Sequence, residues 1–312
     1  MQKIYLDNAA ATPLSKEVVR VMHESLLNDL GNPSSIHSFG RSVRAKIEMA
    51  RKNIANAIKA QPSEIIFTSG GTEANNMVFN CAIKDLQVQR IITCETEHSA
   101  VLNPVFKLPK GVEFEYVDIS DSGTINLVHL EELLSKSAKK TLVSIMHINN
   151  ETGLISPISV INEICKRNQA LFHSDTVQSI AYFDFNLKEV DIDFVTCSGH
   201  KFHGPKGVGF LYVNQKHSIT PFINGGSQEK GLRGGTENVT SILGMEKALM
   251  TIKADLPEIT KHLHHLKSQL FFQLKSEGLE YKINGDEHNS SPAITNLSFQ
   301  TEKDVSMLLF NL

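Results

Sequence analysis

A lysine and an aspartate each follow the end of an apolar segment, where they could act on a bound cofactor. Lys201 comes shortly after Cys197, the last residue of one apolar run, and Asp175 directly follows the run at residues 170–174. A carboxylate there is costly to bury without a positive partner, whereas a lysine in that place suits a Schiff base. Pyridoxal 5'-phosphate requires both groups, a carboxylate for its protonated ring nitrogen and an amine for its aldehyde. A buried Asp–Lys ion pair at the sheet edge is the alternative that stays open.

A glycine-rich turn could hold the phosphate of such a cofactor. Gly70 and Gly71 follow the apolar run at residues 65–68, with Ser69 and Thr72 as neighbouring hydroxyl donors. Small residues let backbone N–H groups approach an anion, and the dipole of a following helix favours negative charge there. An ordinary turn with a good helix cap explains the same residues. The turn is not a Walker loop, because no Gly-Lys-Ser/Thr follows, and no Gly-x-Gly-x-x-Gly motif follows a strand.

Further polar residues follow the ends of other apolar runs. A lone histidine in such a place is more often structural, so His98 is informative only together with its neighbours at other strand ends. In open α/β sheets, ligands bind beyond the carboxyl ends of the strands. The segments that we expect to meet there are residues 95–99, 147–153, 173–178 and 198–207.

The elements that must position these residues are short apolar runs that alternate with helical segments. The runs do not alternate polar with apolar residues, which indicates strands covered on both faces. Helical periodicity is clear at residues 42–58 and 157–167. This alternation predicts an α/β fold with a largely parallel sheet. The predicted strands are residues 65–68, 90–94, 141–146, 170–174, 193–197 and 209–213.

The pattern changes from about Ser241 onward. One long helical stretch at residues 242–276 is followed by two strand-like segments, 280–283 and 294–299. An amphipathic helix begins near Asp304. These elements predict a second, smaller unit.

Bulk properties exclude several classes of function. The chain has 312 residues, is 41% hydrophobic and carries a net charge of −3, so nothing marks a protein that binds nucleic acid or an acidic membrane surface. It has no signal-peptide pattern at its start and no apolar stretch of bilayer length. The four cysteines form no Cys-x-x-Cys pair, which predicts reduced, buried thiols and a cytoplasmic location.

Histidines occur in two places where a metal site could be considered. His262, His264 and His265 lie close together on a polar helical segment with two lysines, which favours a solvated helix face. His200 and His203 flank Lys201, where zinc would compete with the cofactor. We therefore expect no metal site.

A set of motifs along the whole chain points to one known family. One motif is Ser198-Gly199-His200-Lys201 with Gly204-Pro205-Lys206-Gly207. The other segments are residues 5–10, 31–35 with His37, 68–73, 96–98, 147–153, 175–178 and 233–238. In this order, the motifs resemble those of the cysteine desulfurases of the iron–sulfur-assembly type, in the class V aminotransferase family with pyridoxal-phosphate fold type I. The resemblance implies an N-terminal segment (1–14) associated with a small domain, a cofactor-binding large domain (15–250) with a mostly parallel sheet, and an incomplete α+β small domain (251–312).

The resemblance also implies a role for each residue around the cofactor ring. Lys201 would hold the cofactor covalently and later move the substrate α-proton. Asp175 would pair with the ring nitrogen, Gln178 would donate to the phenolic oxygen, and His98 would stack on the ring and assist proton transfer. Asn150 would contact the cofactor or the substrate carboxylate.

The phosphate would be held by residues of two turns and by a neighbouring subunit. Thr236 would reach the phosphate of the second subunit, so a homodimer is implied. The residues expected to bind the phosphate within one subunit are Gly71, Thr72, Ser198 and His200.

The implied activity converts L-cysteine to L-alanine and transfers the sulfur to an enzyme thiolate, which is a soft nucleophile ionised in part near neutral pH. The resulting persulfide would feed iron–sulfur cluster or thio-cofactor assembly through a scaffold or sulfur-acceptor protein. Two alternatives stay open: another class V activity, such as selenocysteine lyase or an aminotransferase, and a non-catalytic scaffold protein that binds the cofactor.

The sequence departs from the family in its cysteines. The family's sulfur-accepting cysteine lies after the helix that begins here near Asp304, and a substrate-binding arginine lies further on, so both would fall beyond Leu312. Cys81, Cys94, Cys165 and Cys197 read as core residues. We expect a fragment of a longer protein, or else a natural truncation, and no persulfide formation by these 312 residues. Ala11, where the family commonly has threonine, is not expected to abolish cofactor binding.

Overall fold

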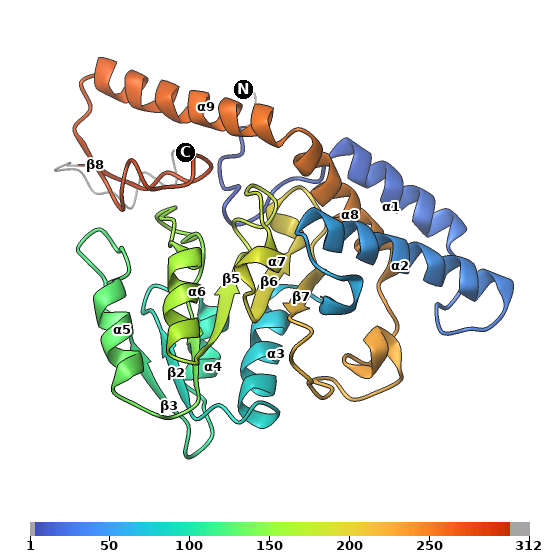
Figure 1. Cartoon of the computed structure of the whole chain (residues 1–312). Helices are drawn as coiled ribbons and strands as arrows, with labels where there is room; N and C mark the ends of the chain where they lie inside the picture. The colour runs from blue at the N-terminus through green and yellow to red at the C-terminus, as the bar shows by residue number, and fades with distance from the viewer. Residues whose placement is uncertain (1–3, 300–312) are drawn as a thin grey trace.

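The centre of the molecule is a seven-stranded sheet with the order β1-β7-β6-β5-β4-β2-β3 (Figure 1). The computed structural model describes residues 4–299. Strand β7 runs antiparallel to both of its neighbours, and the other pairs are parallel. The predicted, mostly parallel α/β sheet is therefore confirmed. The strands are β1 Ile65–Thr68, β2 Arg90–Thr93, β3 Glu113–Tyr116, β4 Thr141–Ser144, β5 Leu171–Asp175, β6 Phe194–Ser198 and β7 Gly209–Val213.

Burial on both faces explains why most strands are continuous apolar runs. Every residue of β1, β2, β4, β6 and β7 is buried. Strand β3 differs, since its Glu113 and Phe114 are exposed and it lies at the open edge of the sheet. Its Glu-Phe-Glu-Tyr sequence is not an apolar run, so the sequence analysis missed it.

Helices cover the two faces of the sheet as two separate apolar layers. Helices α3 and α4 pack on one face against Ile66, Ile91 and Leu211. Helices α2, α5, α6 and α8 cover the other face, and α1 and α2 both pack against α8 (Figure 1). The helices are α1 Lys16–Asn28, α2 Ser38–Ala57, α3 Gly71–Lys84, α4 Ser99–Val105, α5 Leu127–Ser135, α6 Ile158–Arg167, α7 Leu187–Val190, α8 Val239–Ala254 and α9 Leu256–Ser276. None of these described helices has the length and apolar character needed to cross a membrane.

The expected long helix at residues 242–276 is wrong, because the structure contains two helices there. Helix α8 ends at Ala254, Asp255 leaves the helical region, and α9 begins at Leu256. Pro257 lies in the first turn of α9, where its missing N–H is tolerated; inside a continuous helix it would clash with the preceding turn.

Beyond α9, two short strands form a separate antiparallel sheet, as the sequence predicts. They are β8 Tyr281–Ile283 and β9 Leu297–Phe299. Helix α9 has no buried residue. The helix expected from Asp304 lies outside the described residues, and the division into domains at residues 14 and 250 stays a prediction.

A buried ion pair closes the free edge of β1. The Arg51 guanidinium on α2 donates to both oxygens of Glu229, at 2.6 and 2.7 Å, and to the Ile65 carbonyl at 2.9 Å. The Glu229 carboxylate in turn accepts the Phe67 N–H at 2.8 Å. Because β1 is an edge strand, the pair satisfies backbone groups that no neighbouring strand reaches.

We expect Glu229→Gln to lower the free energy of unfolding by about 3 kcal/mol, because it removes the buried counter-ion of Arg51 and leaves only the half-exposed Glu48 carboxylate, at 3.2 Å, to balance that charge. Both side chains are only 2% exposed. Urea unfolding of both proteins measures the difference. Glu131→Gln, which removes an exposed ion pair with Arg167, is the control and should change stability by less than about 1 kcal/mol. Equal losses in the two variants would contradict a special role for the buried pair.

Candidate active site

One cavity of about 510 Å³ lies beyond the carboxyl ends of β5 and β6 and beside the first turn of α3. Nine of the ten residues predicted to bind the cofactor line it. The tenth, Thr236, is exposed and lines a separate cavity of about 210 Å³ near Ser69. The nine lining residues are Gly71, Thr72, His98, Asn150, Asp175, Gln178, Ser198, His200 and Lys201.

Asp175 is the last residue of β5 and is held by two neutral donors. The Val177 N–H donates to one carboxylate oxygen at 3.0 Å, and the Asn75 side-chain amide donates to the other at 2.7 Å. Burial raises the pKa of Asp175, while these two hydrogen bonds and the nearby His98 and Lys201 oppose the rise. Among residues 4–299, no cation bonds to the carboxylate, so it can accept one from the cavity.

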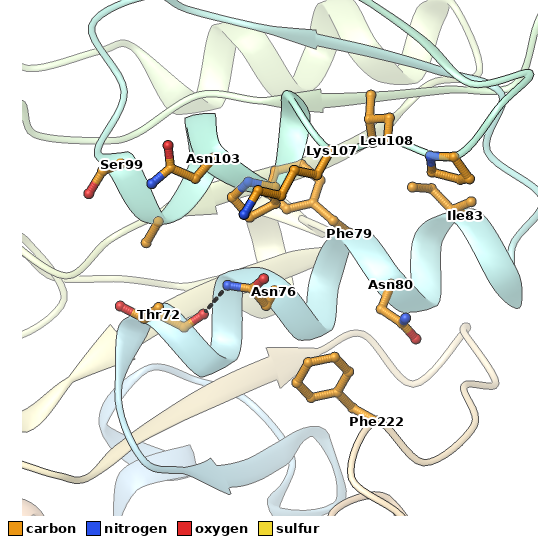
Figure 2. A pocket seen from close by; sticks show the side chains of 13 residues that line it. Thr72, Asn76, Phe79, Asn80, Ile83, Ser99, Asn103, Lys107, Leu108 and Phe222 are labelled. Carbon is orange, nitrogen blue, oxygen red and sulfur yellow. Dashed lines mark hydrogen bonds between the residues drawn. The ribbon is translucent and has the colours of Figure 1, made fainter.

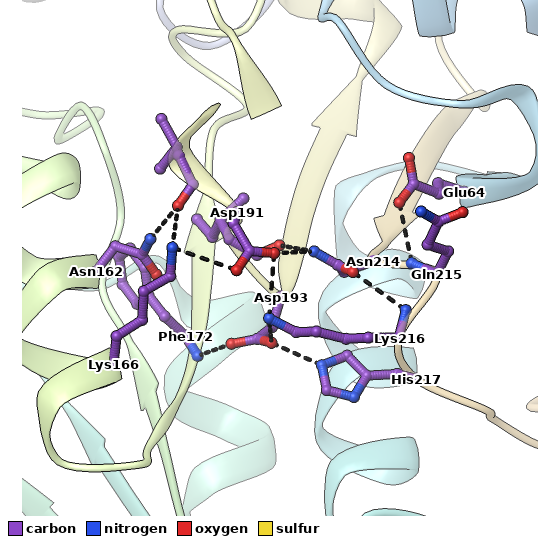
Figure 3. A network of polar contacts seen from close by, with 12 residues as sticks. Glu64, Asn162, Lys166, Phe172, Asp191, Asp193, Asn214, Gln215, Lys216 and His217 are labelled. Atoms are coloured by element: carbon purple, nitrogen blue, oxygen red, sulfur yellow. Dashed lines mark hydrogen bonds and ion pairs between the residues drawn. The ribbon is translucent and has the colours of Figure 1, made fainter. Parts of the chain in front are cut away.

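A second buried aspartate, Asp193, shows the contrast (Figure 3). It lies just before β6, at the other end of the strand from the cavity. Its carboxylate bonds to His217 at 2.6 Å, to the Lys216 amine at 2.9 Å and to the Phe172 N–H at 2.7 Å. Because cationic and neutral donors already surround it, the Asp193 carboxylate fixes the local fold. Unlike Asp175, it has little capacity left to accept a further cation.

Lys201 ends the short helical turn η2 Gly199–Lys201, which follows β6. Its amine donates to the backbone carbonyl of Ala9 at 2.5 Å and to that of Ala10 at 3.0 Å. In the described part of the chain it thus bonds to the N-terminal segment, and the direct Asp175–Lys201 ion pair considered from the sequence is not formed. Burial lowers the pKa of Lys201, which favours a neutral, nucleophilic amine.

The glycine turn at the start of α3 has the shape of an anion cradle. Gly70 has φ +147°, which strongly favours glycine. A side chain at Gly71 would come within 2.9 Å of Val177 and fill part of the cavity. Ser198 and His200 lie on the facing turn with their side chains hydrogen-bonded at 2.9 Å. The N–H groups of the first turn of this 14-residue helix are available to an anion.

The remaining predicted residues reach the cavity from three further loops. His98 caps α4, where its ring nitrogen accepts the Ala100 N–H at 3.0 Å. Gln178 donates to the Ala9 carbonyl at 2.9 Å, and Asn150 donates to Glu151 at 2.9 Å. Their presence in one cavity agrees with the expected site, whereas their individual roles stay predictions.

Several residues that line the cavity were missed from the sequence, among them Asn75 and Ala9. Asn75 bonds to Asp175, and its signal was a polar residue one helical turn after Gly71, on the buried face of α3. The Ala9 carbonyl accepts hydrogen bonds from both Lys201 and Gln178. An alanine acting through its backbone leaves no side-chain signal, so no sequence pattern could reveal that contact.

A second groove of about 390 Å³ lies between α3 and α4, on the outer side of the turn that begins α3 (Figure 2). Thr72 and Ala100 line both this groove and the active-site cavity. Asn76 and Asn80 of α3 face the groove. The two sides of α3 thus separate Asn75, which points to the cavity, from its neighbours Asn76 and Asn80.

All four cysteines are buried, as expected from the sequence. Burial raises the pKa of each thiol, that of Cys81 to about 12. Each therefore stays protonated near neutral pH, which makes it a poor nucleophile.

The donor set of the cavity fits pyridoxal 5'-phosphate. The cofactor needs an amine for its aldehyde, a carboxylate for its ring nitrogen and a cradle for its phosphate. Lys201, Asp175 and the Gly71 turn offer these three groups around one volume of about 510 Å³. Such a volume lies in the usual range for small-molecule sites.

Comparison with known proteins agrees with this chemistry. The aminotransferase class-V family model matches residues 4–310. Cysteine desulfurase IscS of Dictyoglomus turgidum is 42% identical over 311 residues, which cover 99% of this chain and 78% of that protein. A NifS-like protein from Rickettsia africae superposes with a TM-score of 0.91 at 34% identity, covering 99% of this chain and 84% of that one. The structure of SspA in complex with cysteine superposes with a TM-score of 0.86 at 32% identity, covering 99% of this chain and 87% of that one. This chain therefore belongs to the aminotransferase class-V family of pyridoxal-phosphate enzymes, among the relatives of the cysteine desulfurases IscS and NifS.

Proposed function

We propose that this protein is a cysteine desulfurase that uses pyridoxal 5'-phosphate to convert L-cysteine to L-alanine and passes the sulfur to a thiol. The observation that carries the proposal is the shared cavity of Lys201, Asp175 and the glycine turn at Gly71. The relationship to desulfurases and to a structure that contains cysteine supports cysteine as the substrate.

The residues of the cavity divide the work of holding the cofactor. The turn at Gly71 and Thr72, with Ser198 and His200, would hold the phosphate. Burial and the nearby Lys201 and Lys206 lower the pKa of His200 to about 4, so its ring is neutral and adds no charge of its own. Asp175 would hold the ring nitrogen, Gln178 would donate to the phenolic oxygen, and His98 would lie against the ring. When bound, the cofactor supplies an electron sink that stabilises negative charge at the substrate Cα.

Lys201 has two tasks in this proposal. It binds the cofactor through its amine, and it takes the α-proton from the substrate once the amine is free. Its lowered pKa suits both tasks, because only the neutral amine is a nucleophile or a base. The Ala9 and Ala10 carbonyls offer the free amine a fixed place beside the cavity. Asn150 would bind the cofactor or the substrate carboxylate.

Sulfur transfer requires a thiolate that attacks the substrate sulfur while the Cβ–S bond breaks and Cβ takes up a proton. The four buried cysteines are unsuited to this step, because their thiols are protonated and closed off from solvent. We therefore infer that the thiol that accepts the sulfur is not one of these four cysteines. A scaffold or sulfur-acceptor protein and a cytoplasmic location remain parts of the proposal.

A homodimer is also part of the proposal, with Thr236 of one subunit reaching the phosphate of the other. Thr236 is exposed and lies outside its own subunit's active-site cavity. Several large apolar side chains between residues 26 and 39 are exposed, which supports a protein interface in this segment. They are Leu26, Leu27, Leu30, Ile36 and Phe39.

Hydrogen exchange at Cα tests the proposed function against its alternatives. The cofactor-loaded protein in D₂O should introduce deuterium at the α-carbon of L-cysteine, as followed by mass spectrometry, and should form no keto acid. Formation of keto acid and aminated cofactor would indicate an aminotransferase instead. Absence of exchange with cysteine would support a non-catalytic scaffold, and exchange only with selenocysteine would indicate a selenocysteine lyase.

We predict that the 312-residue chain releases no sulfide from L-cysteine in the presence of dithiothreitol, because none of its four thiols is accessible and ionised. A colorimetric sulfide assay measures this directly. Sulfide release that disappears when one of the four cysteines is changed to alanine would show that this thiol accepts the sulfur after all.

A further inference from the structure

We propose that Asn75 is a positioning residue, which holds the Asp175 carboxylate ionised and aimed at the cofactor ring nitrogen. The inference rests on the proposed cofactor site and concerns a residue outside the set expected to contact the cofactor. Asn75 lies in the second turn of α3, is 1% exposed and lines the cavity.

The contact between the two side chains has a single sensible orientation. The Asn75 amide nitrogen lies 2.7 Å from Asp175 Oδ2. A flipped amide would place two acceptor oxygens against each other, so the chemistry assigns the nitrogen to the carboxylate. The Asn75 oxygen has no hydrogen-bond partner among residues 4–299. Since an unpaired buried amide oxygen is costly, the contact with Asp175 must offset that cost.

The two donors to Asp175 together fix the plane of its carboxylate. The Val177 N–H binds Oδ1 from the chain that leaves β5, whereas Asn75 binds Oδ2 from a different element, α3. With one donor on each oxygen, the group cannot rotate freely about its Cβ–Cγ bond. The lone pairs left over are the ones that can face the cavity.

Asn75 also acts on the charge of Asp175. A hydrogen bond to the ionised form of an acid stabilises that form. Burial raises the pKa of Asp175, and the Asn75 hydrogen bond is the largest effect that opposes the rise. The titratable groups that face Asp175 from other elements are His98, Lys201, Glu97 and Cys197. A change at Asn75 leaves all of these groups in place.

The test compares two ligands of the apo-protein that differ only at the ring nitrogen. The first is pyridoxal 5'-phosphate, and the second is its deaza analogue, in which carbon replaces that nitrogen. Equilibrium dialysis followed by ligand absorbance gives both dissociation constants. The method reads the ligand directly, because the chain has no tryptophan whose fluorescence could report binding. The variants are Asn75→Ala and Asn75→Leu, of which the second keeps the volume of the side chain if the first is unstable. Asn80→Ala, on the exposed side of α3, is the matched control (Figure 2).

We expect both Asn75 variants to bind pyridoxal 5'-phosphate about tenfold more weakly, as suits the loss of one hydrogen bond to a charged group. Their affinity for the deaza analogue should stay within about twofold of wild type, and Asn80→Ala should change neither affinity. An equal loss for both ligands would mean that Asn75 supports only the turn or the fold, and no loss would mean that Asp175 does not need it. Either result overturns the inference. Failure of the wild-type protein to bind pyridoxal 5'-phosphate at all would refute the cofactor assignment as well.

Discussion

Lys201→Ala is expected to abolish the yellow colour of the cofactor-loaded protein and to lower α-proton exchange of cysteine by at least about 10³-fold. The reason is that the variant loses both the amine that binds the aldehyde and the base that takes the α-proton, and a positioned acid or base alone contributes about 10²–10⁴-fold. Absorbance spectra of wild type and variant measure the first effect, and mass spectrometry of cysteine recovered from D₂O measures the second.

Lys253 offers a matched control for this prediction. Burial lowers its pKa to about 8, so part of its amine is neutral near physiological pH, and burial lowers the pKa of Lys201 in the same direction. It donates to the Phe183 carbonyl and does not line the active-site cavity. Lys253→Met should therefore keep both colour and exchange. A colourless Lys253 variant, or a yellow Lys201 variant whose colour is fixed by borohydride, would show that the lysine assignment is wrong.

Asp175→Ala is expected to lower α-proton exchange by about 10²–10³-fold, the range for loss of one preorganised electrostatic group. Gln178→Ala should lose less, by about tenfold, because a neutral hydrogen bond to the phenolic oxygen affects the electron sink less than loss of the ring-nitrogen proton does. Single-turnover exchange rates at saturating cofactor compare the two variants.

Asp193→Asn separates this effect from a general loss of stability. Asp193 is a buried aspartate just before β6 of the same sheet, but its partners are Lys216, His217 and the Phe172 N–H (Figure 3). Its variant should unfold at a lower temperature and keep the wild-type exchange rate. Similar exchange rates for the Asp175 and Gln178 variants would contradict the roles assigned to these two residues.

The sheet could be predicted from the sequence because the burial of each strand is visible in its own run of residues. Strands covered on both faces are continuous apolar runs, and six of the seven strands were found in this way. Edge strand β3 was missed because its glutamates can face solvent there. The break between α8 and α9 was missed because apolar periodicity continues across Asp255, although Pro257 marks the restart.

The site could be predicted as far as it depends on strand ends. Asp175 ends β5 and Lys201 follows β6, and these strands are neighbours in the sheet, so their presence at one cavity follows from the parallel topology. The contact of Asn75 depends on the rotation of α3 over the sheet, which the sequence does not specify. The contact of Ala9 depends on the path of a segment with no regular structure, and it uses only backbone atoms.

The proposed function depends above all on a covalent bond between the amine of Lys201 and the cofactor. The most direct measurement is reduction of the cofactor-loaded wild-type protein with borohydride, followed by proteolysis and mass spectrometry of the peptides. The account predicts that the added pyridoxyl-phosphate mass lies on Lys201. Its presence on a different lysine, or its absence from every peptide, would contradict the account.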